Sequence, residues 1–396
     1  MAVFHLKKYS LQGKKVILRV DYNVPLKEGK VLDNTKIKLS LPTIKFLLEK
    51  KCKIILATHL GRPDGEVVSS LSTAILAKEL SRVLKHKVIH LDNCIGRVIK
   101  KKIEQSKEKI FMLENLRFYK EEENNDSFFA HSLASLADIY VNDAFAVSHR
   151  KHASLYAITR QLPSIPGLLL VEEIKNLSKV LKPKRPAVWI LGGAKLNKIR
   201  LITSALKKAD YILLGGALVF PFLKAKNISV GMSKIDSNAV RLAKKILQKK
   251  EAKKIILPLD FTVAETLSPK SKSKVLPYNH LNNNYIALDL GPKTIKLFQD
   301  YMRKAHTIFW NGPLGYYEWH KFSLATKEIG RFMGRLTATT IAGGGETNDA
   351  IHKFNLEEKF THVSTGGGAA LAFLSGGELP ALDALEKSYQ KFRPKN

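Results

Sequence analysis

A short apolar run that ends abruptly in polar or glycine residues, and is followed by a helical segment, recurs along the whole chain. Runs of this kind, rich in Val, Ile and Leu, are typical of strands buried on both faces of a parallel sheet. They lie at residues 16–20, 54–57, 110–113 and 139–141, and then at 188–191, 211–214, 308–310, 340–342 and 363–365. The pattern predicts an α/β fold built on parallel sheets.

The two halves of the chain differ in the residues that come after each run. In the first half the runs lead into polar residues such as Asp21 and His59, and in the second half they lead into glycines such as Gly192 and Gly215. A chain of 396 residues exceeds what one hydrophobic core usually serves. Because ligands of open α/β sheets bind beyond the carboxyl ends of the strands, we expect two Rossmann-like domains with two different ligand sites.

A helical pattern separates the two halves. Leu170, Ile174, Leu177 and Leu181 recur at three or four residues, with Pro163 and Pro166 before them and Pro183 and Pro186 after them. The last residues also have helical spacing, although the sequence does not say where that helix packs. We predict a first domain over 1–167, a connecting helix over 168–181, a second domain over 182–375 and a C-terminal segment over 376–396.

The net charge of +31, from 66 Lys and Arg against 35 Asp and Glu, makes nucleic acid a partner to consider. The basic residues are scattered, and no zinc finger, RNA-recognition signature or aromatic stacking platform accompanies them, so a generally basic surface with no specific nucleic-acid partner is the preferred interpretation. No stretch reaches the roughly 20 apolar residues of a membrane span, and Cys52 and Cys94 are too few for a disulfide framework. We expect buried free thiols in a cytoplasmic protein.

Glycines at strand ends in the second half point to a phosphate-bearing ligand. Such turns let backbone N–H groups approach an anion, and the following helix adds a positive dipole end. The sharpest examples are residues 343–345 and 366–368, although tight helix packing also explains individual glycine turns. The sequence lacks a P-loop, a dinucleotide fingerprint and the protein-kinase signatures, so a nucleotide must be held in another way.

Polar residues gather at the strand ends and turns of the first half. Arginine forks suit carboxylates and phosphates, so several on one surface indicate a small substrate with more than one negative charge. Each residue alone also has a structural explanation, such as a cap, a surface ion pair or a hydrogen-bonded core histidine. The group consists of Asp21, Asn23, His59, Arg62, Arg117, His149, Arg150 and His152.

At these residues the sequence resembles the phosphoglycerate kinase family. The motifs in the first half are RVDYNVP at 19–25, THLGRP at 58–63, ENLRF at 114–118, YVNDAF at 140–145 and HRKHAS at 149–154. In the second half they are GGAK at 192–195, WNGPLG at 310–315 and HVSTGGG at 362–368. The resemblance covers nearly the whole chain and implies reversible phosphoryl transfer between 1,3-bisphosphoglycerate with MgADP and 3-phosphoglycerate with MgATP. The two domains would be joined by a helical hinge in a monomer, with the active site in the interdomain cleft.

The resemblance also implies a role for individual residues. The C-terminal segment would return to the first domain, and Glu318 would contact the ribose. The 3-phosphoglycerate site would contain Asp21, Asn23, Lys36, His59, Arg62, Arg117 and Arg150. The adenine nucleotide site would contain Gly192, Gly193, Lys195, Lys198, Gly215, Gly216, Asn311, Pro313, Gly315, Glu318, Gly344, Gly345, Glu346 and Thr347, with Mg²⁺ at Glu346. The catalytic groups would be Lys36, Lys195, and the backbone amides of Gly367 and Gly368.

Four positions depart from the family pattern near the implied chemistry. Lys36 stands where the family has an arginine, Ala217 replaces a glycine, and Glu346 replaces an aspartate at the magnesium. The fourth departure is the spacing of Lys195 and Lys198, which is one residue shorter than usual. The alternative hypothesis is therefore a catalytically impaired paralogue that still binds nucleotide and an anionic ligand. A nucleic-acid-binding protein on the same scaffold is a more distant third.

Overall fold

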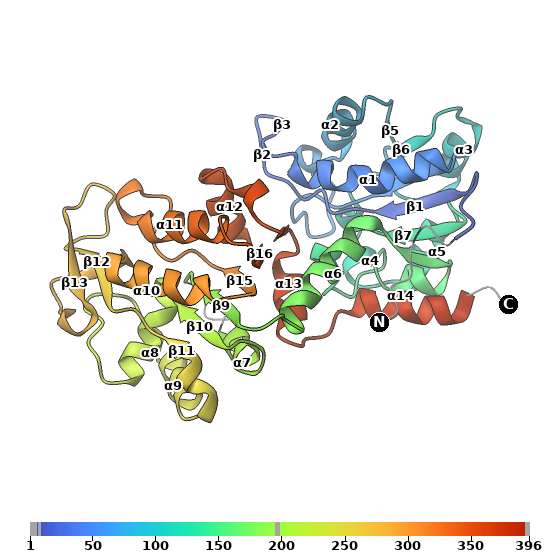
Figure 1. Ribbon diagram of the computed structural model, residues 1–396. Helices are drawn as coiled ribbons and strands as arrows, with labels where there is room; N and C mark the ends of the chain where they lie inside the picture. Colours follow the sequence, from blue (N-terminus) through green and yellow to red (C-terminus); the bar gives the residue numbers. More distant parts are fainter. Residues whose placement is uncertain (1–5, 7–8, 195–198, 393–396) are drawn as a thin grey trace. The chain divides into compact units, whose positions relative to one another are not determined.

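The structure is a computed structural model that describes residue 6 and residues 9–194 and 199–392. Contacts within the chain divide it into two units. Unit 1 consists of Met1–Ile174 together with Glu378–Asn396, and unit 2 consists of Lys175–Gly377. Each unit is built around its own six-stranded parallel sheet with helices on its faces (Figure 1). The predicted α/β class with two Rossmann-like sheets is confirmed.

The sheet of unit 1 has the strand order β5-β6-β4-β1-β7-β8, and all its pairings are parallel. Its strands are β1 (Lys15–Arg19), β4 (Lys53–Ala57), β5 (Ile89–His90), β6 (Ile110–Met112), β7 (Ile139–Asn142) and β8 (Ser164–Pro166). The strand β1 pairs with β4 on one side and with β7, which comes later in the chain, on the other side, so the strand order reverses at β1. A crevice forms at such a reversal, beyond the carboxyl ends of β1 and β7.

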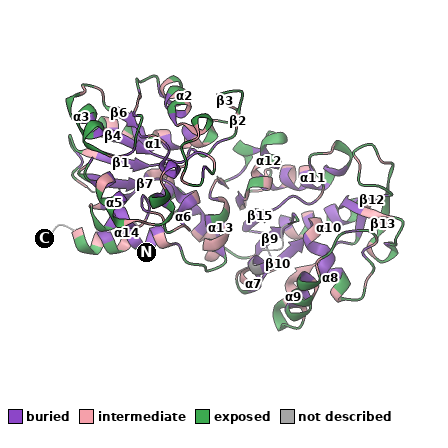
Figure 2. Cartoon of the chain, turned by 180° about the vertical axis from the view of Figure 1, so that it is seen from behind, coloured by how far each residue is buried: buried purple, intermediate pink, exposed green. Residues whose placement is uncertain are grey.

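Successive side chains of a buried strand point to opposite faces of the sheet, and unit 1 uses both. Val16 and Leu18 of β1 join a core with α1 and α2, and Figure 2 shows the central strands β1, β4 and β7 almost entirely buried. Arg19 therefore points to the other face, and it is 1% exposed there. The helices of unit 1 are α1 (Thr35–Glu49), α2 (Ala74–Leu84), α3 (Arg97–Gln105), α4 (Lys120–Glu123), α5 (Ser127–Ala134) and α14 (Pro380–Phe392), and a small hairpin pairs β2 (Leu26–Lys27) with β3 (Lys30–Val31).

Helix α6 (Leu168–Leu181) forms over the residues where the sequence pattern predicts a helix, and the two units divide within it. Helix α14 packs against β8 and against the short helix η5 (Ala157–Arg160), both in unit 1. Ser388 Oγ donates a hydrogen bond to Leu162 O at 3.2 Å, and Lys391 Nζ donates to Arg160 O at 2.9 Å. These contacts attach the C-terminal segment to unit 1.

The main sheet of unit 2 has the order β11-β10-β9-β15-β16-β17 and is parallel throughout. Its strands are β9 (Ala187–Leu191), β10 (Tyr211–Leu214), β11 (Ile255–Ile256), β15 (Thr307–Asn311), β16 (Thr339–Gly343) and β17 (His362–Ser364). Counted along the chain this is the order 3-2-1-4-5-6, in which the crevice lies between β9 and β15. An antiparallel sheet of β12 (Asp260–Ala264), β13 (Ser273–Pro277) and β14 (Ile286–Leu290) accompanies it.

The helices of unit 2 form two groups. Helix α11 (Leu324–Met333) contacts α10 (Pro292–Arg303) and α12 (Gly345–Lys353), whereas α9 (Ser237–Leu247) contacts α7 (Ile199–Lys208) and α8 (Phe220–Ala225). Helix α13 (Gly367–Leu374) packs against α7. In Figure 1 the α11 and α12 group and the α7 to α9 group lie on opposite sides of the main sheet.

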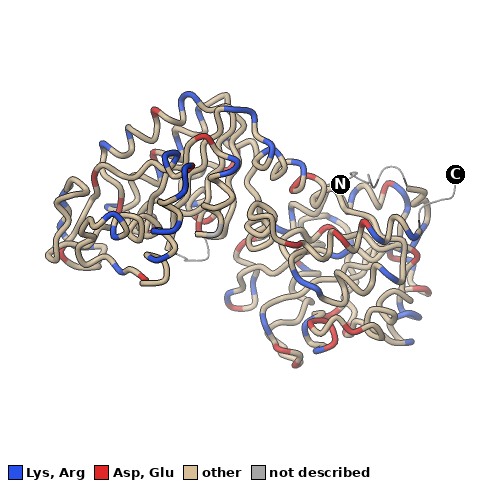
Figure 3. The backbone as a smooth tube through the Cα atoms, turned by 90° about the horizontal axis from the view of Figure 1, so that it is seen from below, with Lys and Arg blue, Asp and Glu red and all other residues tan. Residues whose placement is uncertain are grey.

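The lysines and arginines are distributed over both units. Figure 3 shows them along the backbone of each unit, with acidic residues between them. A nucleic-acid site usually gathers its basic residues on one face or along one helix. The spread of charge therefore supports a generally basic surface, and the lack of a specific nucleic-acid partner stays a prediction.

No strand was predicted from the sequence at residues 163–166, just before the predicted connecting helix. These residues contain β8, which pairs in parallel with β7. Two prolines in so short a stretch give no sign of a strand, but proline is tolerated on an edge strand, where no further strand needs its N–H. The expected free thiols are confirmed, since Cys52 and Cys94 are both buried and reduced. Among the described residues, every helix is too short or too polar to cross a membrane.

Candidate active site

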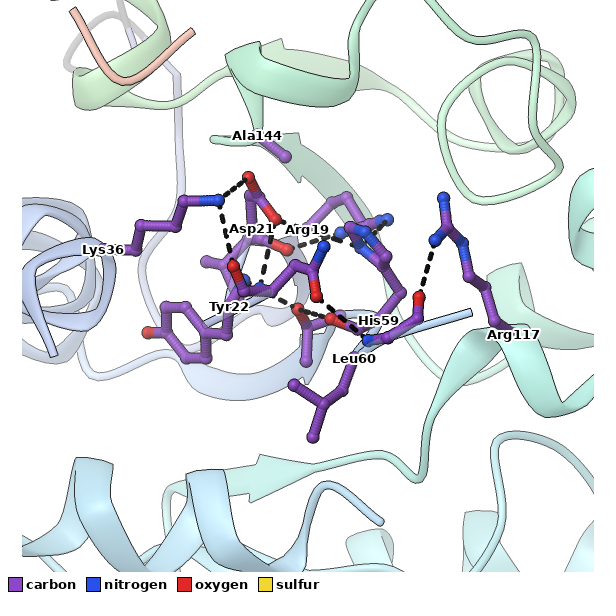
Figure 4. Close-up of polar contacts among 12 residues, drawn as sticks. Arg19, Asp21, Tyr22, Lys36, His59, Leu60, Arg117 and Ala144 are labelled. Atoms are coloured by element: carbon purple, nitrogen blue, oxygen red, sulfur yellow. Dashed lines mark hydrogen bonds and ion pairs between the residues drawn. The ribbon is translucent and has the colours of Figure 1, made fainter. Parts of the chain in front are cut away.

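The residues that follow β1 form the centre of the polar surface in unit 1 (Figure 4). Lys36, on the first turn of α1, donates from Nζ to Asp21 Oδ2 at 2.8 Å and to Asn23 O at 3.1 Å. The backbone N–H of Asn23 donates to Asp21 Oδ1 at 3.2 Å, and Gly61 N donates to Asn23 Oδ1 at 2.9 Å. These bonds connect the ends of β1 and β4 to the start of α1.

His59, two residues after the end of β4, is 2% exposed and lies close to Arg19. The two side chains are 3.3 Å apart, between Arg19 Nη2 and His59 Nδ1. Because a guanidinium can only donate, Nδ1 must accept and the ring proton lies on Nε2. Burial, followed by the charges of Arg19 and Arg117, holds the pKa of His59 well below its usual range. The imidazole is therefore neutral near pH 7.

Arg117 lies in the loop after β6, where the side chain of Asn115 holds its backbone N–H. The side-chain oxygen of Asn115 accepts from Arg117 N at 3.0 Å and from Leu60 N at 3.2 Å. It therefore connects the loop after β6 to the loop after β4. Arg117 donates from Nη1 to Gly61 O at 2.7 Å. Its Nε lies 3.1 Å from Glu123 Oε1 without hydrogen-bond alignment. Burial and the nearby charge of Arg150 lower the pKa of Arg117.

The segment after β7 adds Arg150 and two histidines to this surface. Burial and the charges of Arg19 and Arg150 lower the pKa of His152 to about 3, and burial with Arg150 also lowers that of His149. Arg150 is half-buried and Arg62 is exposed, and neither has an ion pair among the described residues. A surface with several cations and neutral imidazoles favours a ligand with several negative charges.

The structure thus brings together most of the predicted acid-substrate residues. Asp21, Asn23, Lys36 and His59 share one network with the loop that Arg117 contacts, and Arg150 perturbs the pKa of Arg117. Arg62 follows Gly61 in that loop, with no hydrogen bond to the network in the described part of the chain. Sequence reasoning did not assign a role to Arg19, although it stands in the first motif and alternation along β1 places it opposite Leu18.

Unit 2 contains a cavity of about 350 Å³ beyond the carboxyl ends of β9 and β15. Its walls are largely apolar, with Phe220, Phe261, Leu267 and Leu288 among them, as suits a flat aromatic base. Ala217, one of the departures from the family pattern, also lies in the wall. The predicted nucleotide residues that line this cavity are Gly193, Gly216, Pro313, Gly315, Glu318 and Glu346.

Other predicted nucleotide residues support this cavity from outside its lining. Gly192 N donates to Asn311 O at 2.8 Å, and Gly215 N donates to Leu191 O at 2.9 Å, which continues the strand pairing. Thr347 Oγ1 accepts from Gly312 N at 2.7 Å, and Asn311 Nδ2 donates to Gly343 O at 2.5 Å. Gly344 and Gly345 open α12, and Gly344 has a positive φ of 108°. Lys195 and Lys198 lie outside the described residues.

Gly216 shows why glycine is needed at one of these turns. Its φ is +56°, and a Cβ atom there would lie 2.6 Å from Gly193 N and 2.8 Å from Pro313 O. Gly193 N itself donates to Pro313 O at 2.7 Å. The glycine turns therefore pack tightly on one another, and this close packing by itself requires glycine at Gly216.

Asp289 is a buried carboxyl in the cavity wall that sequence reasoning missed. Its Oδ1 accepts from Leu290 N at 2.9 Å and its Oδ2 from Ala325 N at 3.0 Å. Burial raises the pKa of Asp289 to about 8, against the opposing effect of these hydrogen bonds. No local pattern identifies it, since it lies inside an apolar strand.

Two helix starts in unit 2 present backbone N–H groups without helical partners. Helix α12 carries Glu346 in its first turn, and α13 begins at Gly367, whose φ is +48°. The space beside Gly345 and Gly367 is open, because a Cβ atom at either position would meet no neighbouring atom within 4 Å. Such starts are suited to phosphate groups, and the described residues hold no group of three His, Cys, Asp or Glu side chains that would bind a metal alone.

Comparison with known proteins identifies the family of this chain. The family model described as phosphoglycerate kinase matches residues 6–377. The chain belongs to the phosphoglycerate kinase family. It is 44% identical over 391 residues to the phosphoglycerate kinase of Finegoldia magna, covering 96% of this chain and 98% of that one. It is also 44% identical over 389 residues to the phosphoglycerate kinase of Thermosipho africanus, covering 96% and 97%.

Solved phosphoglycerate kinase structures have the same fold. The enzyme from Coxiella burnetii matches with a TM-score of 0.87 at 35% identity, over 97% of this chain and 99% of that one. The enzyme from Pyrococcus horikoshii matches with a TM-score of 0.87 at 33% identity, over 98% and 100%. The predicted family and the predicted phosphotransferase class are confirmed, and nothing in the comparisons favours an impaired paralogue.

Proposed function

We propose that this phosphoglycerate kinase family member transfers a phosphoryl group reversibly between MgATP and 3-phosphoglycerate. The observation that carries the proposal is the contrast between the two units. Unit 1 presents arginines, a lysine and neutral histidines beyond β1, β4, β6 and β7, whereas unit 2 presents an apolar cavity of about 350 Å³ edged by glycine turns. The first suits a small acid with several charges, and the second suits an adenine nucleotide.

The acid would be bound by Asp21, Asn23, Lys36, His59, Arg62, Arg117 and Arg150. Lys36 supplies a fixed positive charge through its bond to Asp21, and Arg150 supplies a guanidinium with no competing carboxylate among the described residues. His59 holds its proton on Nε2, which leaves an N–H donor for an oxygen of the substrate. Several donors on different strands would orient the carboxylate for attack.

The chemistry needs positioning and positive charge more than acid or base catalysis. The carboxylate of 3-phosphoglycerate has an ordinary pKa of roughly 3.5, so it is ionised near pH 7 and needs no general base. One of its oxygens forms a bond to the γ-phosphorus of ATP while the bond to the β–γ bridging oxygen breaks, and ADP leaves with that electron pair. Lys36, Lys195 and the amides of Gly367 and Gly368 would stabilise the charge on the transferring group.

Mg²⁺ would arrive with the nucleotide and neutralise charge on its phosphates. Glu346 is the single carboxylate that we assign to it, which suits an ion held mostly by phosphate oxygens and water. The ribose would contact Glu318, and the base would lie against the apolar wall of the cavity. That the enzyme is cytoplasmic, monomeric and hinge-bending remains a prediction from the sequence and its resemblance.

The test is the initial rate of ADP formation from MgATP and 3-phosphoglycerate, coupled to a dehydrogenase. We expect turnover that falls by about 100-fold in Lys195→Ala, and that persists in Lys36→Arg. Lys38→Arg, an exposed substitution on the same helix, is the matched control. A wild-type chain that folds and binds both ligands but does not turn over, with or without Lys36→Arg, would instead identify an impaired relative.

A further inference from the structure

Glu122 is fully buried in unit 1 and has no role among the residues assigned to the substrate. Both of its carboxylate oxygens are bound by one residue: Ser154 donates from N to Oε2 at 2.8 Å and from Oγ to Oε1 at 2.6 Å. The backbone oxygen of Glu122 accepts from Ala153 N at 2.8 Å. Three hydrogen bonds therefore join the short helix α4 to residues 153–154.

The two segments joined in this way carry cations of the proposed substrate site. Arg117 precedes Glu122 in the stretch that forms η3 (Leu116–Phe118) and α4. His149, Arg150 and His152 precede Ser154 in the loop after β7. The loop has little regular structure of its own, so the attachment at its end limits where Arg150 can lie.

Arg19 is connected to the same attachment. It donates from Nε to Ser154 Oγ at 2.9 Å, and that oxygen in turn donates to Glu122. The serine hydroxyl thus accepts from a cation and donates to an anion, which makes both bonds charge-assisted. His152 Nδ1 also lies 3.9 Å from Glu122 Oε1.

Glu122 is also the buried counter-charge of this cation group. Burial raises the pKa of Glu122, while Arg19, the bonds from Ser154, and Arg117 act in the opposite direction. If Glu122 lost its negative charge, the positive charges of Arg19, Arg117 and Arg150 would repel one another without this buried carboxylate to balance them. Loss of the carboxylate should therefore move the arginines apart.

We propose that Glu122 is a positioning residue for the acidic substrate, holding Arg117 and Arg150 at a fixed spacing through its bonds to Ser154 and Ala153. The inference rests on the proposed function, which assigns both arginines to 3-phosphoglycerate. A role in long-range electrostatics alone predicts the opposite result, because removal of a negative charge near an anion site would strengthen binding.

The test compares Glu122→Gln and Ser154→Ala with Glu121→Gln, which changes an exposed glutamate on the same helix. Titration calorimetry measures the affinity for 3-phosphoglycerate, and initial rates give the KM of each substrate. We expect the dissociation constant and the KM for the acid substrate to rise about tenfold in the first two variants, with the KM of MgATP within twofold and the control unchanged. The double variant should bind 3-phosphoglycerate no more weakly than the single variant with the larger effect, because the two residues act through one attachment.

Unchanged or tighter 3-phosphoglycerate binding in a folded Glu122→Gln protein overturns the inference, and so does an equal rise in the KM of both substrates. If Glu122→Gln does not fold, Ser154→Ala decides the question alone, since it keeps the carboxylate and removes only the hydroxyl. Arg150→Ala separates the two proposals. If Arg150→Ala leaves the affinity for 3-phosphoglycerate unchanged, the assignment of the substrate site is wrong. If Arg150→Ala weakens this affinity while Glu122→Gln and Ser154→Ala do not, only the role of Glu122 is contradicted.

Discussion

Lys36 Nζ lies 2.8 Å from Asp21 Oδ2, so the lysine at the position where the resemblance implies an arginine is fixed by an ion pair beyond the end of β1. An ammonium held in this way keeps the positive charge but offers no planar fork. We therefore expect Lys36→Met to lower kcat by about 100-fold, since the proposed mechanism uses this cation to stabilise the transferring group. Lys36→Arg should stay within about threefold of the wild type.

The control for this prediction is Lys38→Met, because Lys38 is exposed on the same helix. Steady-state rates at saturating MgATP and 3-phosphoglycerate provide the comparison. Equal losses in Lys36→Met and Lys38→Met would show that general charge, and not the position beside Asp21, determines the rate.

Gly216→Ala should damage the nucleotide cavity. The positive φ of Gly216 and the closeness of Gly193 N and Pro313 O leave no room for a methyl group. We expect a loss of about 1–2 kcal/mol in the free energy of unfolding and a rise in the KM of MgATP, with the KM for the acid substrate unchanged. Gly376→Ala provides a comparison, because Gly376 also has a positive φ but no neighbour within 4 Å. Equal nucleotide KM values in the two variants would contradict the prediction.

Lys353 holds the loop that carries Glu318. Its Nζ donates to Tyr317 O at 3.0 Å and to Glu318 O at 2.7 Å, which connects α12 to that side of the cavity. Lys353→Met keeps the length of the side chain and removes both bonds, so we expect the KM of MgATP to rise about fivefold. Titration of ADP binding by fluorescence or calorimetry measures the effect directly, and an unaltered ADP affinity would mean that the loop holds its position without the lysine. Lys359→Met, on an exposed lysine in the same unit, is the control.

His152 predicts a specific sensitivity to acid. Its pKa is about 3 in the folded protein and roughly 6.5 in an unfolded chain, so the unfolded chain takes up the proton first as the pH falls. The free energy of unfolding therefore carries no penalty from His152 above pH 6.5, and it decreases as the pH falls from 6.5 toward 3. We expect His152→Gln to reduce the loss of stability between pH 7 and pH 5 by on the order of 1 kcal/mol. Urea unfolding at both pH values tests this, and His86→Gln, on an exposed histidine, should leave the difference unaltered.

The sheets could be predicted because their buried strands are continuous apolar runs. Residues 54–57 and 188–191, for example, fall within β4 and β9. The antiparallel strands β12 to β14 could not be predicted in the same way, because β13 is mostly exposed and has no apolar run. The edge strand β8 was not predicted, because its three residues, Ser164–Pro166, form no apolar run and include a proline, and only pairing with β7 identifies it.

The grouping of candidate site residues could be predicted where polar side chains come soon after the end of a strand. Asp21 and His59 stand beyond β1 and β4, and parallel strands bring their carboxyl ends to one edge. The link from Arg19 through Ser154 to Glu122 joins segments far apart in the sequence, and no local spacing encodes it. Asp289 was hidden for a similar reason, since one acidic residue within an apolar strand gives no periodic signal.

Helix α14 brings the end of the chain back to the unit that contains its beginning. During synthesis, therefore, the ribosome releases every residue of unit 2 before unit 1 has received its last helix. Unit 2 is continuous along the chain and can complete its core while translation continues. Unit 1, in contrast, has to wait for α14, because Ala381 of that helix packs against Ala144, Val147 and Leu155. The nascent chain can therefore finish the core of unit 2 before the core of unit 1 has all its parts.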